Sequence, residues 1–175
     1  MCKVERIMGP SSEDFLTQHR ALEPILDQGI QETMTSTPSE MESSDPTYVF
    51  IDMLAQAAVL VLLTALKSLT LDTETYHDTC GEYEKKAFKA AEMIHSLVQR
   101  LSHLGCFKVH PFTPIALFIC AEFTRSLQTP SSNHAAQFKT ISTSLRQLAP
   151  ANKLAQMLEV KLQRDPQTDG TTRDL

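Results

Sequence analysis

The sequence predicts an all-α protein, an irregular bundle of five or six helices. Apolar residues recur at intervals of three and four through most of the chain, which places them on one face of a helix. The chain has no Trp, only 5 Gly and 6% aromatic residues, a composition that favours helices over strands. At 175 residues and 42% hydrophobic content, the chain is long enough to bury one core.

Residues 1–31 are predicted to form an N-terminal helical segment. Ser11 and Ser12 suit a helix start. The apolar residues that follow are Phe15, Leu16, Leu22, Ile25, Leu26 and Ile30. The next stretch, 32–47, is rich in Ser, Thr, Pro and acidic residues. This composition is typical of a disordered linker.

The stretch Tyr48–Leu69 is predicted to be a helix with apolar residues on more than one face. Its uncharged part runs from Met53 to Leu66. As a helix this part rises about 21 Å, whereas a bilayer core is about 30 Å thick. We therefore expect a buried helix of a soluble protein. If the other helices leave part of it in water, the isolated chain should self-associate.

A long amphipathic helix is predicted over Glu82–Leu104, after a polar connector at Leu71–Thr79. Its apolar stripe is Ala87, Ala90, Ala91, Ile94, Leu97, Val98, Leu101 and Leu104. A turn at 105–111 leads into a more apolar helix, Thr113–Leu127, with Thr113 as the N-cap and Pro114 in the first turn. This helix should be wrapped by others. We expect Ile94, Leu97, Leu101, Phe118 and Ile119 to be buried together.

Two shorter helices are predicted to complete the domain at 48–163. The first has Phe138, Ile141, Leu145 and Leu148 on one stripe, and the second has Leu154, Met157, Leu158 and Leu162. Pro150 is expected to end one helix and begin the other. Met157 is expected to fill the core. The polar residues 164–175 are predicted to be a disordered tail.

The charge pattern argues against nucleic-acid binding by this chain. The formal net charge is −5, and no Lys or Arg lies between Arg20 and Lys67. Affinity for a phosphate backbone requires clustered basic residues. No signal peptide is visible at the N-terminus, and the four Cys show no paired spacing. We expect an intracellular protein with reduced thiols.

Two clusters contain residue types that can bind metal or catalyse a reaction, and plain structural roles explain both. His103, Cys106 and His110 have zinc-ligand chemistry, but they span a helix end and a loop and have no fourth partner nearby. His77, Asp78 and Cys80 lie together in what is predicted to be an exposed connector, whereas catalytic Cys–His pairs come from distant segments. Neither cluster is predicted to be a site. The sequence therefore predicts no enzyme, no catalytic or metal-binding residue and no cofactor.

Three segments resemble the regulatory region of the fungal zinc binuclear cluster transcription factors. They are Asp52–Leu63, Lys89–Ile94, and His110–Pro114 leading into Phe118–Ala121. The likeness covers roughly residues 48–163. The family's six-cysteine DNA-binding module is missing, because four scattered Cys cannot build it. The resemblance implies an all-helical regulatory module in the nucleus that binds other parts of the regulator or coregulators, with a small-molecule effector as a further option.

Two other functions remain open from the sequence. One is a stand-alone helical adaptor that dimerises through exposed helix faces, and the other is a small-ligand-binding helical protein. A ligand site would need polar groups that converge in a pocket, and the predicted helix interiors contain almost none.

Overall fold

The computed structural model describes residues 45–68, 74–101, 108–127 and 134–164, and scattered positions between 17 and 31. Those ranges contain only helix, turns and short irregular stretches, with no strand, so the all-α prediction is confirmed. The helices are α2 (Pro46–Lys67), α3 (Glu74–Leu101), α4 (Thr113–Ser126), α5 (His134–Leu148) and α6 (Lys153–Gln163). The described positions between 17 and 31 are helical. The predicted linker and tail lie almost entirely outside the described residues.

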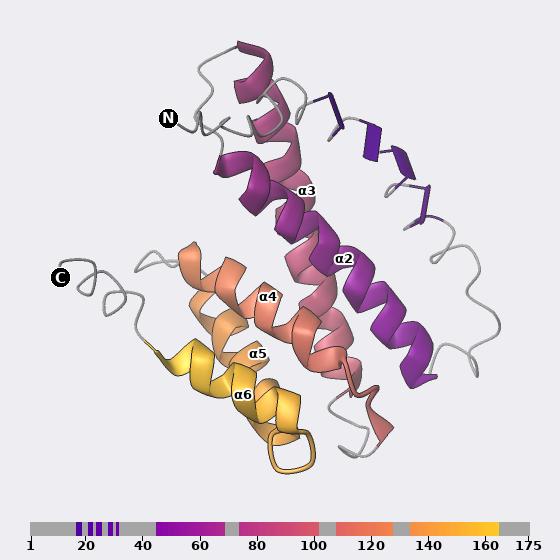
Figure 1. Ribbon diagram of the computed structural model, residues 1–175, viewed down its shortest axis with the longest axis vertical. Helices are drawn as coiled ribbons and strands as arrows, with labels where there is room; N and C mark the ends of the chain where they lie inside the picture. The colour runs from indigo at the N-terminus through magenta and orange to yellow at the C-terminus, as the bar shows by residue number, and fades with distance from the viewer. Residues whose placement is uncertain are drawn as a thin grey trace, which may run out of the picture.

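The helices form two groups that meet at α4 (Figure 1). The long helices α2 and α3 pack side by side, and α5 and α6 pack on each other. Helix α4 contacts all four of the others. The expectation that this very apolar helix is wrapped by its neighbours is therefore confirmed.

One continuous core joins the two groups. Its largest fully buried apolar side chains are Met53, Leu60, Leu63, Leu66, Ile94, Val98, Leu117, Ile141 and Leu145. Four come from α2 and the others from α3, α4 and α5. Burying a side chain of this size stabilises a fold by about 1.5–3 kcal/mol. Helix α2 is thus a major source of the domain's stability.

Helix α2 begins and ends within two residues of its predicted limits. The Asp45 side chain caps it by accepting from the Thr47 backbone N–H at 2.7 Å, and Pro46 occupies the first turn. At the other end, Lys67 pairs with Glu84 of α3 at 2.6 Å. Helix α2 is long and apolar enough to cross a membrane, but a buried core helix of a soluble protein has the same length and composition. Within the most apolar 18-residue window of α2, 44% is buried in the domain.

The prediction of a polar connector at Leu71–Thr79 is wrong, because α3 already begins at Glu74. The apolar stripe of α3 extends further back than expected. Cys80 packs against the core and Tyr83 is buried, and these residues continue the spacing of three and four that reaches Ala87. Packing against α2 therefore stabilises two additional helical turns whose own composition is polar.

The start and burial pattern of α4 also differ from expectation. Thr113 is not the N-cap but the first helical residue, and Phe112 caps the helix without a side-chain hydrogen bond. Thr113 is buried, and its N–H donates to the His110 carbonyl at 3.0 Å. Phe118 and Ile119 are only partly buried. The helix is rotated so that Ala116, Leu117 and Cys120 enter the core instead.

Helix α5 buries Ile141, Leu145 and Leu148 as predicted, with Phe138 half-buried. Helix α6 starts at Lys153 and not at Pro150, because the Asn152 side chain accepts from the N–H groups of Leu154 and Ala155. Met157 is 62% exposed, so its predicted core role is wrong. Ala155 faces the core in its place.

Candidate interaction surface

The outer face of α2 is apolar and open to solvent. Tyr48, Ile51, Leu54 and Val61 are between 43% and 48% exposed. Ile51, Leu54, Ala58, Val61 and Ala65 follow one another at alternating steps of three and four residues, and we call this set the α2 seam. Thr47 and Ser68 extend the same spacing at the two ends, and both are exposed. The seam lies opposite the buried face, so α2 is apolar on two sides.

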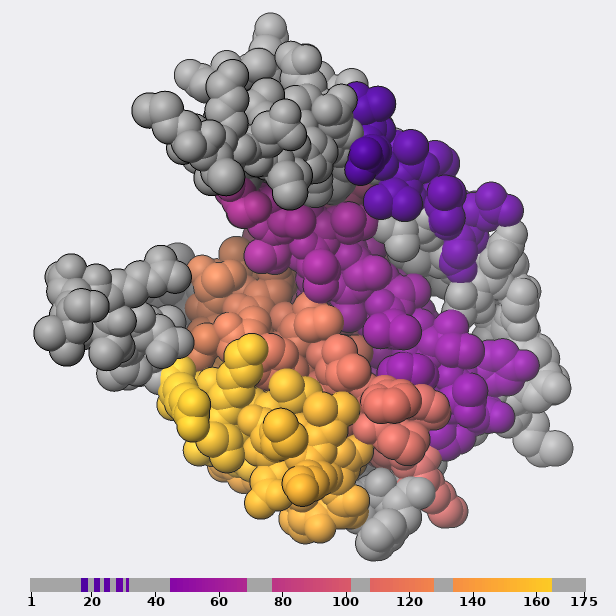
Figure 2. Space-filling view, viewed as in Figure 1, coloured from indigo at the N-terminus to yellow at the C-terminus, as the bar shows by residue number. Residues whose placement is uncertain are grey.

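A groove is lined by residues of α2, α4 and the described N-terminal positions. Figure 2 shows the surface of α2 between these two neighbours. The groove has a volume of about 430 Å³, and its described lining is Leu22, Ile25, Leu54, Ala57, Ala58, Val61, Leu62 and Ile119. The volume lies within the range of small-molecule pockets, but such pockets also place polar groups to orient the ligand. The described lining contains none. The groove therefore suits apolar side chains of a protein better than a polar effector.

Charge is nearly absent from the seam and its borders. Asp52 and Lys67 are the charged residues within α2, and Lys67 is paired with Glu84. Asp52 lies toward α3. Burial raises the pKa of the Asp52 carboxyl, while a hydrogen bond from Gln56 and the charge of Arg100 lower that pKa by less. Its Oδ1 has no hydrogen-bond partner among the described residues. Ionised Asp52 is thus incompletely compensated by its surroundings.

We expect Asp52→Asn to raise stability at neutral pH. A folded pKa above 3.8 means that Asp52 favours the fold most when protonated, and this contribution is lost as pH rises through the folded pKa. The substitution should therefore stabilise the protein at pH 7, by about 1 kcal/mol or less, and make little difference at pH 3. Urea unfolding at both pH values measures this. A loss of stability at pH 7 would mean that the Arg100 charge outweighs burial.

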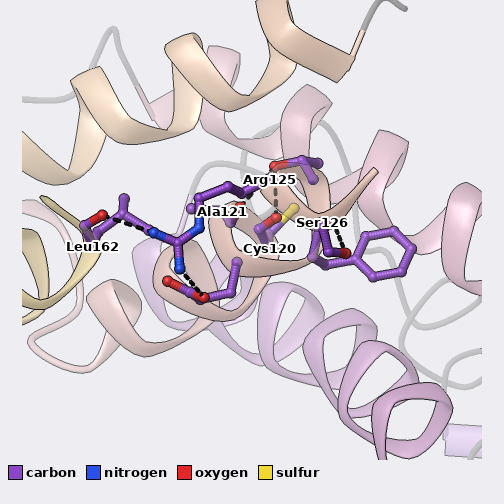
Figure 3. A network of polar contacts seen from close by, with 8 residues as sticks. Cys120, Ala121, Arg125, Ser126 and Leu162 are labelled. Carbon is purple, nitrogen blue, oxygen red and sulfur yellow. Dashed lines mark hydrogen bonds and ion pairs between the residues drawn. The ribbon is translucent and has the colours of Figure 1, made fainter. Parts of the chain in front are cut away.

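A second polar arrangement ties α4 to α6 (Figure 3). The Arg125 guanidinium donates to the Leu162 carbonyl at 3.0 Å and pairs with Glu122 at 2.6 Å. Leu162 lies in the last turn of α6, where carbonyls lack helical partners. Nearby, the Thr124 hydroxyl donates back to the Cys120 and Ala121 carbonyls. The Arg125 bond positions α4 against α6, whereas the Thr124 bonds lie within α4.

The residues that the sequence singled out for possible chemistry do not assemble into a site in the described part of the chain. His110 stacks on Phe50 of α2, with ring centroids 4.0 Å apart, and so fixes the turn before α4. His103 and Cys106 lie outside the described residues. His77 and Asp78 are exposed on α3. Within the described residues, no group of three His, Cys, Asp or Glu side chains could hold a metal ion.

The chain is similar in sequence to fungal transcription factors. The chain is 34% identical over 163 residues to the pigment biosynthesis transcriptional activator pigB of Monascus ruber, covering 91% of this chain and 29% of pigB. It is 34% identical to the transcription factor tazR of Aspergillus terreus, covering 92% of this chain and 25% of tazR. The chain is homologous to part of the fungal cluster-specific transcription factors.

The match extends to other regulators of this kind. The citrinin biosynthesis transcriptional activator ctnR of Monascus purpureus is 29% identical over 85% of this chain and 26% of its own length. The chain thus spans between a quarter and a third of these transcription factors. No protein-family profile and no solved structure matches it. The family expected from the sequence is confirmed, and the matched region is consistent with a regulatory module.

The α2 seam was missed as a distinct feature at the level of sequence. The signal was present, because the steps of three and four from Ile51 to Ala65 are visible in the chain. It was hidden because α2 is apolar on nearly every face, so the buried and exposed stripes overlap in the sequence. Only the packing of α3 and α4 separates them.

Proposed function

We propose that this chain is the regulatory, protein-contacting module of a fungal cluster-specific transcription factor and that it acts through the outer face of α2. It performs no catalysis and does not bind DNA directly. Its partners are the rest of the regulator, coregulators or further copies, and it works in the nucleus. The predicted division into an N-terminal segment, a linker and a helical domain at 48–163 belongs to this proposal.

The observation that favours a contact role is the exposed, uncharged face of α2. Burying an apolar side chain such as Leu54 or Val61 against a partner is favourable in free energy. A contiguous exposed apolar surface on a folded domain usually marks an interaction site. The homologous regulators bear names that describe gene activation, which agrees with a module that contacts other proteins.

A tethering assay in a fungal host tests the proposal. The chain is fused to an unrelated DNA-binding domain, and a reporter gene with the matching binding site is measured. We expect reporter output to change several-fold relative to the DNA-binding domain alone, because the module recruits coregulators or blocks their binding. Val61→Glu should abolish most of this change. An output that is the same with and without the chain would contradict the proposal.

Two controls sharpen the assay. Met157→Glu places the same charge on α6, at a residue that is 62% exposed, and should leave reporter output unchanged. A gel-shift experiment with the isolated chain should show only weak, salt-sensitive binding to duplex DNA, as its net charge of −5 implies. Sequence-selective retention of DNA would contradict the part of the proposal that excludes direct DNA binding.

A further inference from the structure

We infer that Leu22 and Ile25 belong to an intramolecular cover, which holds part of the groove on α2 and is displaced when a partner protein docks there. This inference rests on the proposed function, since it names how access to the same surface is regulated. The evidence is the lining of the groove, the partial burial of the two residues and the composition of the helix that carries them.

The groove brings together two parts of the chain that are distant in sequence. Leu22 and Ile25 line part of it, and the described N-terminal positions run alongside α2 (Figure 1). Leu54 and Val61 of α2 and Ile119 of α4 belong to the remaining lining. Because the described lining is apolar throughout, the contact across the groove is hydrophobic and non-directional. Apolar side chains of another protein can make the same kind of contact.

The two N-terminal residues fill the groove only in part. Leu22 is 46% exposed and Ile25 is 65% exposed, and a volume of about 430 Å³ remains between the walls. On the α2 side, Leu54 and Val61 are still 43% and 48% exposed. Stabilisation by apolar contact scales with the area removed from water. A partner that fills the groove more completely therefore gains more area and can displace Leu22 and Ile25.

The helix that carries Leu22 and Ile25 is weak by its own composition. The described positions between 17 and 31 are helical, and they include Pro24 and Gly29. Pro24 lacks the N–H that a helix interior uses, and Gly29 loses more backbone entropy on folding than other residues do. In the described part of the chain, a Cβ added at Gly29 would meet no atom within 4 Å, so no close contact requires glycine there. Such a short helix depends on packing for its stability, and its helicity is therefore coupled to its contact with α2.

Thiol labelling inside the groove measures displacement of the cover in the full chain. Ala58 lines the groove and is half-buried, so Ala58→Cys places a thiol there with little change in size. A bulky maleimide should label this thiol at least about threefold faster when Leu22→Glu and Ile25→Glu are added, because charged side chains leave an apolar groove. Met157→Cys in the same protein provides an exposed reference on α6, and its labelling rate should not change.

Gly29→Ala tests the same step in the opposite direction without removing a contact. Ala favours a helix over Gly by a margin equivalent to about fourfold in an equilibrium constant, and the space at Gly29 accommodates the methyl group. The variant should slow labelling of Ala58→Cys by up to about fourfold. Ala21→Glu is the control for added charge, because Ala21 is exposed and does not belong to the described lining. Labelling rates that respond neither to the paired Glu variants nor to Gly29→Ala would overturn the inference.

The tethering assay connects the cover to regulation. Leu22→Glu with Ile25→Glu should enlarge the reporter change at least about twofold, because the apparent affinity for a partner rises with the fraction of open chains. Gly29→Ala should reduce the reporter change, and Ala21→Glu should leave it at the wild-type level. Reporter output that stays constant in all these variants while the labelling rates respond would show that the cover does not control access, and would overturn the inference.

The outcomes separate this inference from the proposed function. A chain whose labelling rates do not respond, but whose reporter change is abolished by Val61→Glu, would overturn the cover and support the proposed function. A chain whose labelling rates respond as expected, but which never changes reporter output, would support the cover and contradict the proposed function.

Discussion

Leu97→Ala is expected to lower the free energy of unfolding by about 2–5 kcal/mol, the range for truncating a large core side chain. Leu97 is 4% exposed on α3, in the face that packs on α2. The loss combines the apolar area returned to water with the cavity that rigid neighbours cannot fill. Urea unfolding followed by circular dichroism measures it. This loss would be a large part of the stability of a domain of this size.

Gln99→Ala is the matched control on the same helix. Gln99 is exposed on α3, so its truncation should change the free energy of unfolding by about 0.5 kcal/mol or less. Similar destabilisation by the two variants would mean that α3 does not pack through the face described here.

Cys120 is expected to react with a thiol reagent at least about a hundredfold more slowly in the folded protein than in the unfolded chain. The residue is fully buried, and its thiol donates toward the Ala91 carbonyl at 3.9 Å. Burial raises the pKa of the Cys120 thiol to about 12. Since the thiolate is the nucleophile, almost none is present at pH 7. Pulse labelling with an alkylating reagent, followed by peptide mass spectrometry, measures the rate with and without urea.

Cys80 provides the comparison within the same experiment. It is only half-buried on α3, so it should be labelled in the native protein without urea. Rapid labelling of Cys120 under native conditions, at the rate of Cys80, would show that α4 separates from α3 readily and that this part of the core is loosely packed.

The boundaries of the helices were predictable where a local signal marks them. Pro46 and the break after Lys67 limit α2 within two residues of expectation. The start of α3 was not predictable, because residues 74–79 are polar and their helicity depends on the packing of Cys80 and Tyr83 against the core. At α6, Pro150 was a misleading signal, since Asn152 makes the capping hydrogen bonds.

The burial of α4 shows a different limit. With apolar residues on nearly every face, the sequence predicts that the helix is central but not which side faces α3. The structure rotates Cys120 and Leu117 inward and leaves Phe118 and Ile119 at the edge. Met157 similarly fits the apolar spacing of α6 and yet lies outside. Periodicity identifies a stripe, whereas neighbouring helices select which part of it is covered.

The sequence by itself determined the helical class, the family resemblance and the acidic character that argues against DNA contact. These follow from local periodicity and composition, which do not depend on how distant segments meet. Only the tertiary structure decided which apolar face of α2 stays exposed. The outer face stays partly exposed because α3 and α4 cover the opposite side of α2. The exposure of a side chain depends on which other helices pack against its face, and the spacing of apolar residues along one helix does not specify those neighbours.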